Sequence, residues 1–273
     1  MSIVLTPPSE PGLLRRTLAA IGRATRIRVV FTLQLAALTW GVLSEAVRPS
    51  SWRRTVRMEF WRVLRQAAGG GLPATLVTSA LAGLVMVLQA LYWLGEAGEE
   101  GLVGPIIVTV LVREITPLLI GSVVLGRSGI VAMAEMGALQ LGGQGRILTA
   151  QGIDMFSLLI LPRGVAFALA TFTLGVIFVL GALVVGFVAG SLIGAVHISI
   201  WLFFDRVSEA MNAADFAVFP AKMLAIGLLV ALVASLTAFS ADPAERLAKV
   251  LPRAFVRGVM AIMFVSLVLS LAV

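Results

Sequence analysis

Residues 102–125 read LVGPIIVTVLVREITPLLIGSVVL, an apolar run that carries an adjacent arginine and glutamate, Arg113 and Glu114, near its middle. On insertion scales each of these charges costs about 2.5–3.5 kcal/mol at a helix centre, and each surrounding Leu, Ile or Val returns about 0.3–0.6 kcal/mol. The run can therefore insert as a transmembrane helix. Its two charges need partners on other helices or a hydrated cavity, because intramembrane charges are rarely kept without a role. A purely structural ion pair and a polar element of a transport cavity are both open interpretations.

The whole chain has the composition of an integral membrane protein. Of its 273 residues, 59% are hydrophobic and 13% are charged, whereas globular domains contain roughly 25% charged residues. There is no cysteine, so a disulfide framework is excluded. Segment 1–28 lacks the short apolar region and cleavage site of a signal peptide. No H-E-x-x-H motif or Walker A sequence occurs, so we expect no metal site and no ATP site in this chain.

Positive charge is concentrated at the N-terminus. Residues 1–65 contain eleven arginines and three glutamates, a balance of +8, although the whole chain carries +7. Apolar side chains recur at helical spacing from Trp52 to Ala67, and arginines occupy the other side, which predicts an amphipathic helix in the membrane interface. Attraction to anionic headgroups explains these arginines more simply than nucleic-acid binding, so we expect no nucleic acid as a partner.

We predict an all-α integral membrane protein with about five spans after this interfacial helix. The expected spans are 72–94, 102–125, 157–196, 217–239 and 254–273. Segment 29–43 is short for a span and is expected to lie shallowly, with an extra span as the alternative. Residues 1–71 are accordingly assigned to a cytoplasmic and interfacial region, and residues 72–273 to a transmembrane domain.

The distribution of charge between the spans favours an N-in, C-out orientation. If block 157–196 crosses once, the outer segments hold only one basic residue, Arg206. The cytoplasmic segments then hold the N-terminal arginines with Arg127, Arg146, Arg163, Arg246, Lys249, Arg253 and Arg257. The outer segments are then acidic, with Glu96, Glu99, Glu100, Asp205, Glu209 and Asp215. A short external helix is expected at 203–213.

Several further residues are candidates for chemistry or packing. Lys222 is expected either to snorkel to the surface or to bind a lipid phosphate, and Gln89 to form an interhelical hydrogen bond. Arg127 and Glu135 bracket the expected inner end of the second span and could pair. Gly126–Gly129 also matches the GxSG of intramembrane serine proteases, but His197 is expected a bilayer thickness away, which excludes a dyad. Gly186, Gly190 and Gly194 favour close helix packing, with a dimer face as the alternative.

The order of residues resembles the MlaE/YrbE permeases, the membrane subunits of MCE-associated lipid ABC transporters. The resemblance covers about residues 60–260. The matching positions are Leu111–Glu114, Pro117, Gly126-Arg127, Gly129, Ala134-Glu135, Gly137, Gly152–Asp154 and Pro162-Arg163, and outside this core Arg65-Gln66, Gly71, Pro73, Gly83, Gln89, Gly98, Glu100, Val103-Gly104, Lys222 and Arg253.

This resemblance implies a multi-pass inner-membrane homodimer that holds phospholipid between its two copies. It implies a cytoplasmic ATP-binding cassette subunit that supplies ATP, often a small STAS-domain protein, and an MCE protein on the periplasmic side. The permease itself is not expected to be an enzyme or to bind a cofactor. Lipid-binding or gating candidates are Gln89, Arg113, Glu114, Lys222 and Arg253.

The segment at about 139–154 corresponds to the part of the family that meets the ATPase. Its coupling candidates are Arg127, Glu135, Leu139, Gln144, Arg146, Leu148, Gly152 and Asp154. Here the chain departs from the family, because Gly142–Leu148 lacks the acidic positions that other members carry, and its three glycines each cost a helix about 1 kcal/mol relative to alanine. We therefore expect a short or loose coupling helix, or one that is fitted to a divergent ATPase. A membrane scaffold that anchors an MCE protein or ATPase without moving lipid is the alternative function.

Overall fold

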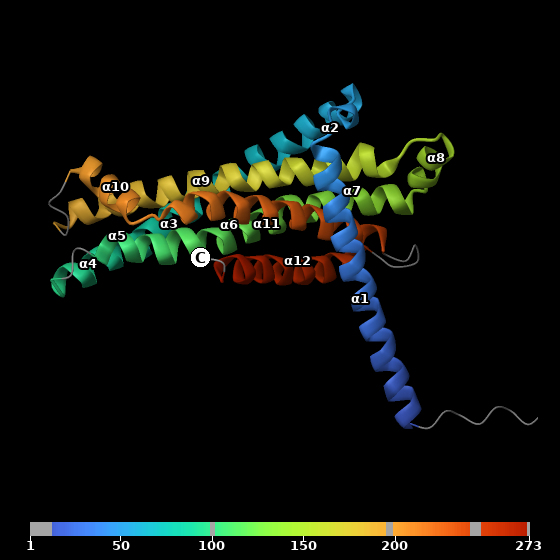
Figure 1. The fold of residues 1–273 in the computed structure, drawn as a ribbon, viewed down its shortest axis with the longest axis horizontal. Coiled ribbons are helices and arrows are strands. Elements are labelled where there is room, and N and C mark those ends of the chain that lie inside the picture. Colours follow the sequence, from blue (N-terminus) through green and yellow to red (C-terminus); the bar gives the residue numbers. More distant parts are fainter. Residues whose placement is uncertain (1–12, 99–101, 195–198, 241–246, 272–273) are drawn as a thin grey trace, which may run out of the picture.

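The described part of the chain is built from helices alone. The computed structural model describes residues 13–98, 102–194, 199–240 and 247–271, and Figure 1 shows most of the helices lying side by side in an elongated bundle. The α-helices are α1 Leu13–Ala46, α2 Arg54–Leu64, α3 Gly70–Ala82, α4 Leu88–Glu96, α5 Val103–Ile106, α6 Thr116–Val124, α7 Ile130–Leu141, α8 Gln144–Ala150, α9 Leu161–Leu192, α10 Ile200–Glu209, α11 Ala213–Phe239 and α12 Leu247–Ser270. A 3₁₀ turn, Pro49–Ser51, precedes α2, and π-helical turns lie at Arg65–Gly69, Gly83–Val87, Ile107–Ile115, Leu125–Gly129 and Phe156–Ile160.

Six helices of the described residues are long and apolar enough to cross a membrane, so the protein is a multi-pass membrane protein. They are Arg28–Ala46, Arg54–Glu96, Val103–Gln140, Phe156–Leu192, Ala213–Phe239 and Val250–Ser270. The predicted all-α fold is confirmed. The long third block is one helix of 37 residues, as expected for a single crossing. The N-in, C-out orientation stays a prediction.

Two expected helix boundaries were wrong. The interfacial helix and the first span form one continuous helix, Arg54–Glu96, of 43 residues. At about 1.5 Å per residue it extends about 64 Å, roughly twice the hydrocarbon core, so one part of it must project beyond the core. The second span likewise continues to Gln140, and Gly126–Gly129 is an internal π turn rather than a helix end. Polar residues and glycines mark where a helix leaves lipid, and they do not by themselves end it.

Helix α1 runs across the bundle rather than along it (Figure 1). Its C-terminal part is attached to the bundle through Val42, which is 1% exposed, and through Gly41, which faces the ring of Phe156. Arg257 lies over the ring of Phe31 at 4.3 Å. Segment Arg28–Ala46 has the length and hydropathy of a span, so the shallow position expected for 29–43 and the alternative of an extra span both stay predictions.

Helix α11 lies at the centre of the bundle. It packs against α9, α12 and α7, and every residue from Val230 to Ala238 is buried. A helix that is apolar all round belongs in such a position, because no face of it needs water. A short helix, α10, Ile200–Glu209, is observed near the expected segment 203–213, and its external location stays a prediction. Three residues separate it from α11, which begins at Ala213.

Small residues let α9 approach the helix Arg54–Glu96 closely. A Cβ added to Gly83 would lie 2.2 Å from the carbonyl oxygen of Ala182, and one added to Gly186 would lie 2.3 Å from Cβ of Val87. Only hydrogen fits at these points of contact, so the glycine spacing of α9 serves packing within the chain. Gly194 differs, because it lies after the end of α9 with φ of +73°.

We expect Gly83→Ala to destabilise the bundle by about 1–3 kcal/mol, the usual range for overpacking, although alanine is the better helix former. Gly95→Ala is the matched control in the same continuous helix, because a Cβ there meets nothing within 4 Å. Thermal unfolding in detergent, followed by circular dichroism, measures both. Equal midpoints for the two variants would contradict a tight crossing at Gly83.

Candidate functional site: a charged cavity among three helices

A small cavity lies where the helix Val103–Gln140, α11 and α12 meet. Its volume is about 190 Å³, and four of its side chains are charged. The lining residues are Thr109, Val112, Arg113, Glu114, Asp215, Val218, Phe219, Lys222, Leu269 and Ser270. We call the cluster of Arg113, Glu114, Asp215, Lys222 and Ser270 the charged cavity.

Asp215 neutralises Arg113. Its Oδ1 lies 2.6 Å from Nε of Arg113, and its Oδ2 accepts a hydrogen bond of 2.7 Å from Nη2. The same carboxylate accepts from the backbone N–H of Asn212 at 2.8 Å and completes a capping box at the start of α11. Because only 3% of the Asp215 side chain is exposed, its charge requires this pairing.

Pro117 makes the backbone of Arg113 available as a ligand. A proline has no N–H to donate to the carbonyl four residues earlier, which here is that of Arg113. The missing bond falls at the end of the π-helical turns Ile107–Ile115, as expected where a helix ladder is interrupted. Nζ of Lys222 donates to this carbonyl at 2.6 Å.

Lys222 is linked to Glu114 through a serine. Its Nζ donates to Oγ of Ser270 at 2.7 Å, and Ser270 donates to Oε1 of Glu114 at 2.6 Å. The direct distance from Nζ to Oε1 of Glu114 is 3.8 Å. The Lys222 side chain is only 3% exposed and that of Glu114 is 47% exposed, so the cation is fixed inside the protein while the carboxylate reaches the surface.

The charged cavity brings together three of the predicted residues, Arg113, Glu114 and Lys222. The neighbours Arg113 and Glu114 find different partners, as expected for side chains about 100° apart on a helix. Lys222 does not snorkel, because the Arg113 carbonyl and Ser270 hold it inside. Gln89, exposed on α4, and Arg253, exposed on α12, do not line this cavity.

Sequence reasoning missed Asp215 and Ser270. Asp215 was assigned to an acidic outer segment, whereas it lies in the first turn of α11. The pattern Asn212-Ala-Ala-Asp215 is a capping-box signal that would have placed it there. Asp215 then precedes Lys222 by seven residues, two helical turns on one face. No comparable signal distinguishes Ser270 from the other serines of the apolar helices.

A second charged cluster joins α2, α7 and α9, and we call Glu59, Arg62, Glu135 and Arg163 the α2–α7–α9 network. Nη2 of Arg163 lies 2.7 Å from Oε2 of Glu135 and 3.5 Å from Oε1 of Glu59. Arg62 lies 2.6 Å from Glu59 and 3.5 Å from Glu135. The Arg163 side chain is 2% exposed, so its charge requires a carboxylate partner. The two glutamates together balance the two arginines of the network.

The expected pairing of Arg127 with Glu135 was wrong. Eight residues separate the two in one helix, about 12 Å along its axis, and Glu135 instead pairs across the bundle. Arg127 is exposed, its guanidinium lies against Gly70, and no carboxylate of the described residues is within ion-pair distance. Ser128 of the GxSG match is buried, and His197 lies outside the described residues.

The expected coupling segment folds as a short helix between two glycine turns. α8, Gln144–Ala150, has seven residues, and it begins after Gly143, whose φ is +69°. Gly152, with φ of +75°, lies in the following turn. Gln144 is exposed, Leu139 and Leu148 are half-buried, and the side chain of Arg146 lies outside the described residues.

Asp154 caps the helix that leaves this segment. Its carboxylate accepts from the backbone N–H of Phe156 at 3.0 Å, the N–H of Ser157 at 3.2 Å and the Ser157 hydroxyl at 2.6 Å. These bonds, that of the Ser157 hydroxyl first, hold the pKa of Asp154 below its usual value.

The fold is that of a multi-pass membrane protein, and the charges of its cavity are paired between the helices. The chain belongs to the family described as Permease MlaE, which matches residues 60–272. It is similar to Protein TRIGALACTOSYLDIACYLGLYCEROL 1, chloroplastic, of Arabidopsis thaliana, with 27% identity over 184 residues, which are 67% of this chain and 50% of that protein.

Two bacterial proteins are also similar. A probable ABC transporter permease protein of Rickettsia bellii is 29% identical over 123 residues, 45% of this chain and 46% of that protein. The probable ABC transporter permease protein RT0041 of Rickettsia typhi is 29% identical, with the same coverage of 45% and 46%. The chain thus spans about half the length of the curated relatives that it matches.

We expect Asp215→Asn to destabilise the protein by about 3–5 kcal/mol, because it leaves Arg113 without its counter-charge while keeping the capping geometry. Asp205→Asn, at an exposed position of α10, is the control. Denaturant unfolding in detergent measures both. Adding Arg113→Met should restore much of the loss, because it removes the unpaired cation; no restoration would contradict the Arg113 charge as the cause of the loss.

We expect Asp154→Ala to lower the stability by about 1 kcal/mol near neutral pH, as for other lost helix caps. The lowered pKa of Asp154 means that this contribution is present above the unfolded pKa of about 3.9 and disappears as the pH falls through the lower folded pKa. Unfolding midpoints of the wild type and the variant should therefore converge in acid. Asp205→Ala should show no such pH-dependent difference.

Proposed function

We propose that this chain is the membrane permease subunit of an ABC-type lipid transporter that moves phospholipid. The observation that carries the proposal is the charged cavity of a chain that belongs to the MlaE permease family. The similar Rickettsia proteins are named probable ABC transporter permeases. On this proposal the ATP is bound and hydrolysed by a separate subunit, and this chain is a transport subunit rather than an enzyme.

The chemistry of the cavity suits a lipid phosphate. Lys222 is already close to a carboxylate, Glu114, at a distance of 3.8 Å that leaves room for a stronger ligand. A phosphate oxygen can replace Glu114 as the partner of Lys222 with a short charge-assisted hydrogen bond. Glu114, 47% exposed, can turn toward water when it is displaced.

The size of the cavity restricts what it can hold. Its 190 Å³ is below the roughly 300–1,000 Å³ of pockets that enclose a drug-sized ligand. It fits a headgroup phosphate and not a whole phospholipid, so the acyl chains need another apolar surface. A second copy of the chain facing the cavity would supply one, and we therefore propose a homodimer with the cargo between its subunits.

The remaining partners follow from the same proposal. Segment 139–154, with α8 and the candidates Arg127, Glu135 and Arg146 around it, meets the ATP-binding cassette subunit. An MCE-domain protein, and in some assemblies a STAS-domain protein, complete the complex in the inner membrane. Closure of the ATPase on ATP moves this segment, and the helix Val103–Gln140 carries the movement toward the charged cavity.

The test uses the complex that copurifies with the tagged chain, reconstituted in phospholipid vesicles. We expect Lys222→Met to reduce phospholipid-stimulated ATPase activity and fluorescent-lipid transfer by roughly tenfold or more, since a hydrogen bond to a charged group contributes about 1.5–3 kcal/mol. Arg206→Gln, which alters an exposed arginine of α10 outside the cavity, should match the wild type.

Three results would oppose the proposal. Absence of both an ATPase and bound lipid from the purified complex would remove its basis. Lipid transfer that continues without the ATPase would favour the scaffold function. Full activity of Lys222→Met would show that the charged cavity does not handle cargo.

A further inference from the structure

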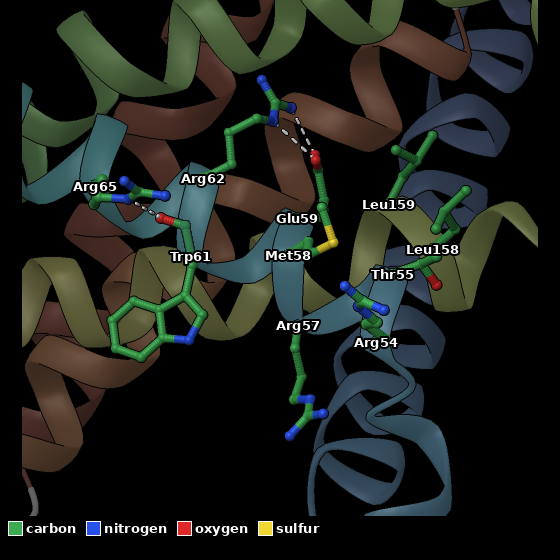
Figure 2. A pocket seen from close by; sticks show the side chains of 10 residues that line it. All are labelled: Arg54, Thr55, Arg57, Met58, Glu59, Trp61, Arg62, Arg65, Leu158 and Leu159. Atoms are coloured by element: carbon green, nitrogen blue, oxygen red, sulfur yellow. Dashed lines mark hydrogen bonds and ion pairs between the residues drawn. The ribbon is translucent and has the colours of Figure 1, made fainter.

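An arginine-rich groove lies between the exposed face of α2 and the π turn Phe156–Ile160. Its volume is about 860 Å³, and it is lined by residues of α2, by Arg65 directly after α2, and by the π turn that begins the helix Phe156–Leu192. Figure 2 shows the ten lining side chains, which are Arg54, Thr55, Arg57, Met58, Glu59, Trp61, Arg62, Arg65, Leu158 and Leu159. We call this feature the arginine groove.

Three of its four arginines have no acidic partner within the part of the chain that the structure describes. Arg62 is paired with Glu59, and Figure 2 shows it turned back to that carboxylate, away from the side to which Arg57 points. Arg65 donates to the carbonyl of Trp61. No carboxylate of the described residues lies within ion-pair distance of Arg54, Arg57 or Arg65. The groove therefore has an excess of positive charge that an anion would balance.

Apolar side chains lie on the same exposed face as these cations. Arg54, Arg57, Met58, Trp61 and Arg65 follow the spacing of one helix face. Met58 is 65% exposed and Trp61 is 56% exposed, while Val56 and Val63 of the opposite face are buried in the bundle. Leu158 and Leu159 add further apolar surface. Arginines beside aromatic and apolar groups can bind both the phosphate and the acyl chains of a lipid. A free phosphate ion has no apolar part for the apolar groups to contact.

The groove also lies where lipid headgroups are expected. Leu158 and Leu159 are near the first residue of the span Phe156–Leu192, and Arg54 begins the span Arg54–Glu96. That helix of 43 residues is too long for the hydrocarbon core. We expect its arginine-rich first turns at the membrane surface, because arginine is attracted to anionic headgroups and tryptophan is enriched at the membrane–water interface.

We propose that the arginine groove binds the phosphate of an anionic phospholipid, with the acyl chains against Trp61, Met58 and the two leucines. This lipid is separate from the transported cargo, because none of the groove residues lines the charged cavity. Arg62 lines the groove and is also paired with Glu59 and Glu135 of the α2–α7–α9 network. A lipid in the groove would therefore lie beside that network.

The test measures binding of POPG to the delipidated full-length protein by native mass spectrometry, with POPC as the neutral comparison. The variant Arg54→Gln/Arg57→Gln/Arg65→Gln is compared with Arg26→Gln/Arg28→Gln/Arg206→Gln, which removes the same charge from exposed positions outside the groove. Both are made with Lys222→Met, so that lipid held at the charged cavity does not contribute. Because Lys222→Met is present in both variants, the measurement tests the arginine groove alone, and its result does not depend on whether the charged cavity transports lipid.

We expect the groove variant to bind POPG roughly a hundredfold more weakly, which corresponds to about 1 kcal/mol for each arginine at an anionic surface. The control variant should stay close to the parent protein, and POPC should bind weakly to all three. An equal loss in both variants, or equal binding of POPC and POPG to the parent, would overturn the proposal.

Two further measurements identify the source of the phosphate. Trp61→Gln should weaken POPG binding several-fold, and millimolar inorganic phosphate should leave bound POPG in place. Displacement of POPG by inorganic phosphate would mean a site for the free ion and not for lipid. If the groove variant keeps its POPG but loses a copurifying protein, the arginines serve a protein interface and the lipid site is wrong.

Discussion

The structure depends on the neutralisation of charge inside apolar helices. Arg113 lies in a helix that the membrane must accept, and its charge is compensated by Asp215 on another helix at 2.6 Å. Without that contact the cost of an isolated cation in a low-dielectric environment would amount to several kcal/mol. The position of α11 beside the helix Val103–Gln140 is thus a requirement of the charge as well as of packing.

The backbone takes part in the same compensation. Because Pro117 has no N–H, the carbonyl of Arg113 lacks its usual helical partner and becomes the acceptor for Lys222. Lys222 then has a carbonyl, a serine and a nearby carboxylate as partners. A proline that looks like a helix breaker in the sequence therefore creates a cation site, and the π-helical turns before it absorb the misfit.

Much of the fold could be predicted from the sequence, but fewer of the contacts. Long apolar runs specify spans directly, and a charge such as Arg113 stands out within one. Partners across the bundle leave no such one-dimensional signal, so Asp215 and Ser270 were missed and Glu135 was given the wrong partner. Helix ends were misplaced for a related reason. Hydropathy reports where a helix meets water, whereas hydrogen bonding continues through Gly69–Gly71 and through Gly126–Gly129.

Apolar packing alone cannot set the register of these helices. Lipid tails are as apolar as leucine, so a helix that slides or rotates in the membrane exchanges one apolar neighbour for another at little cost. Polar and steric contacts carry that information instead. The Arg113–Asp215 pair fixes α11 against the helix Val103–Gln140, and the Arg163–Glu135 pair fixes α9 against α7. The crossing of Gly83 with Ala182 fixes α9 against the helix Arg54–Glu96, because no other residue fits there. These three contacts tie four of the spans together, and the half-exposed Glu114, which accepts a hydrogen bond from Ser270, takes part in none of them.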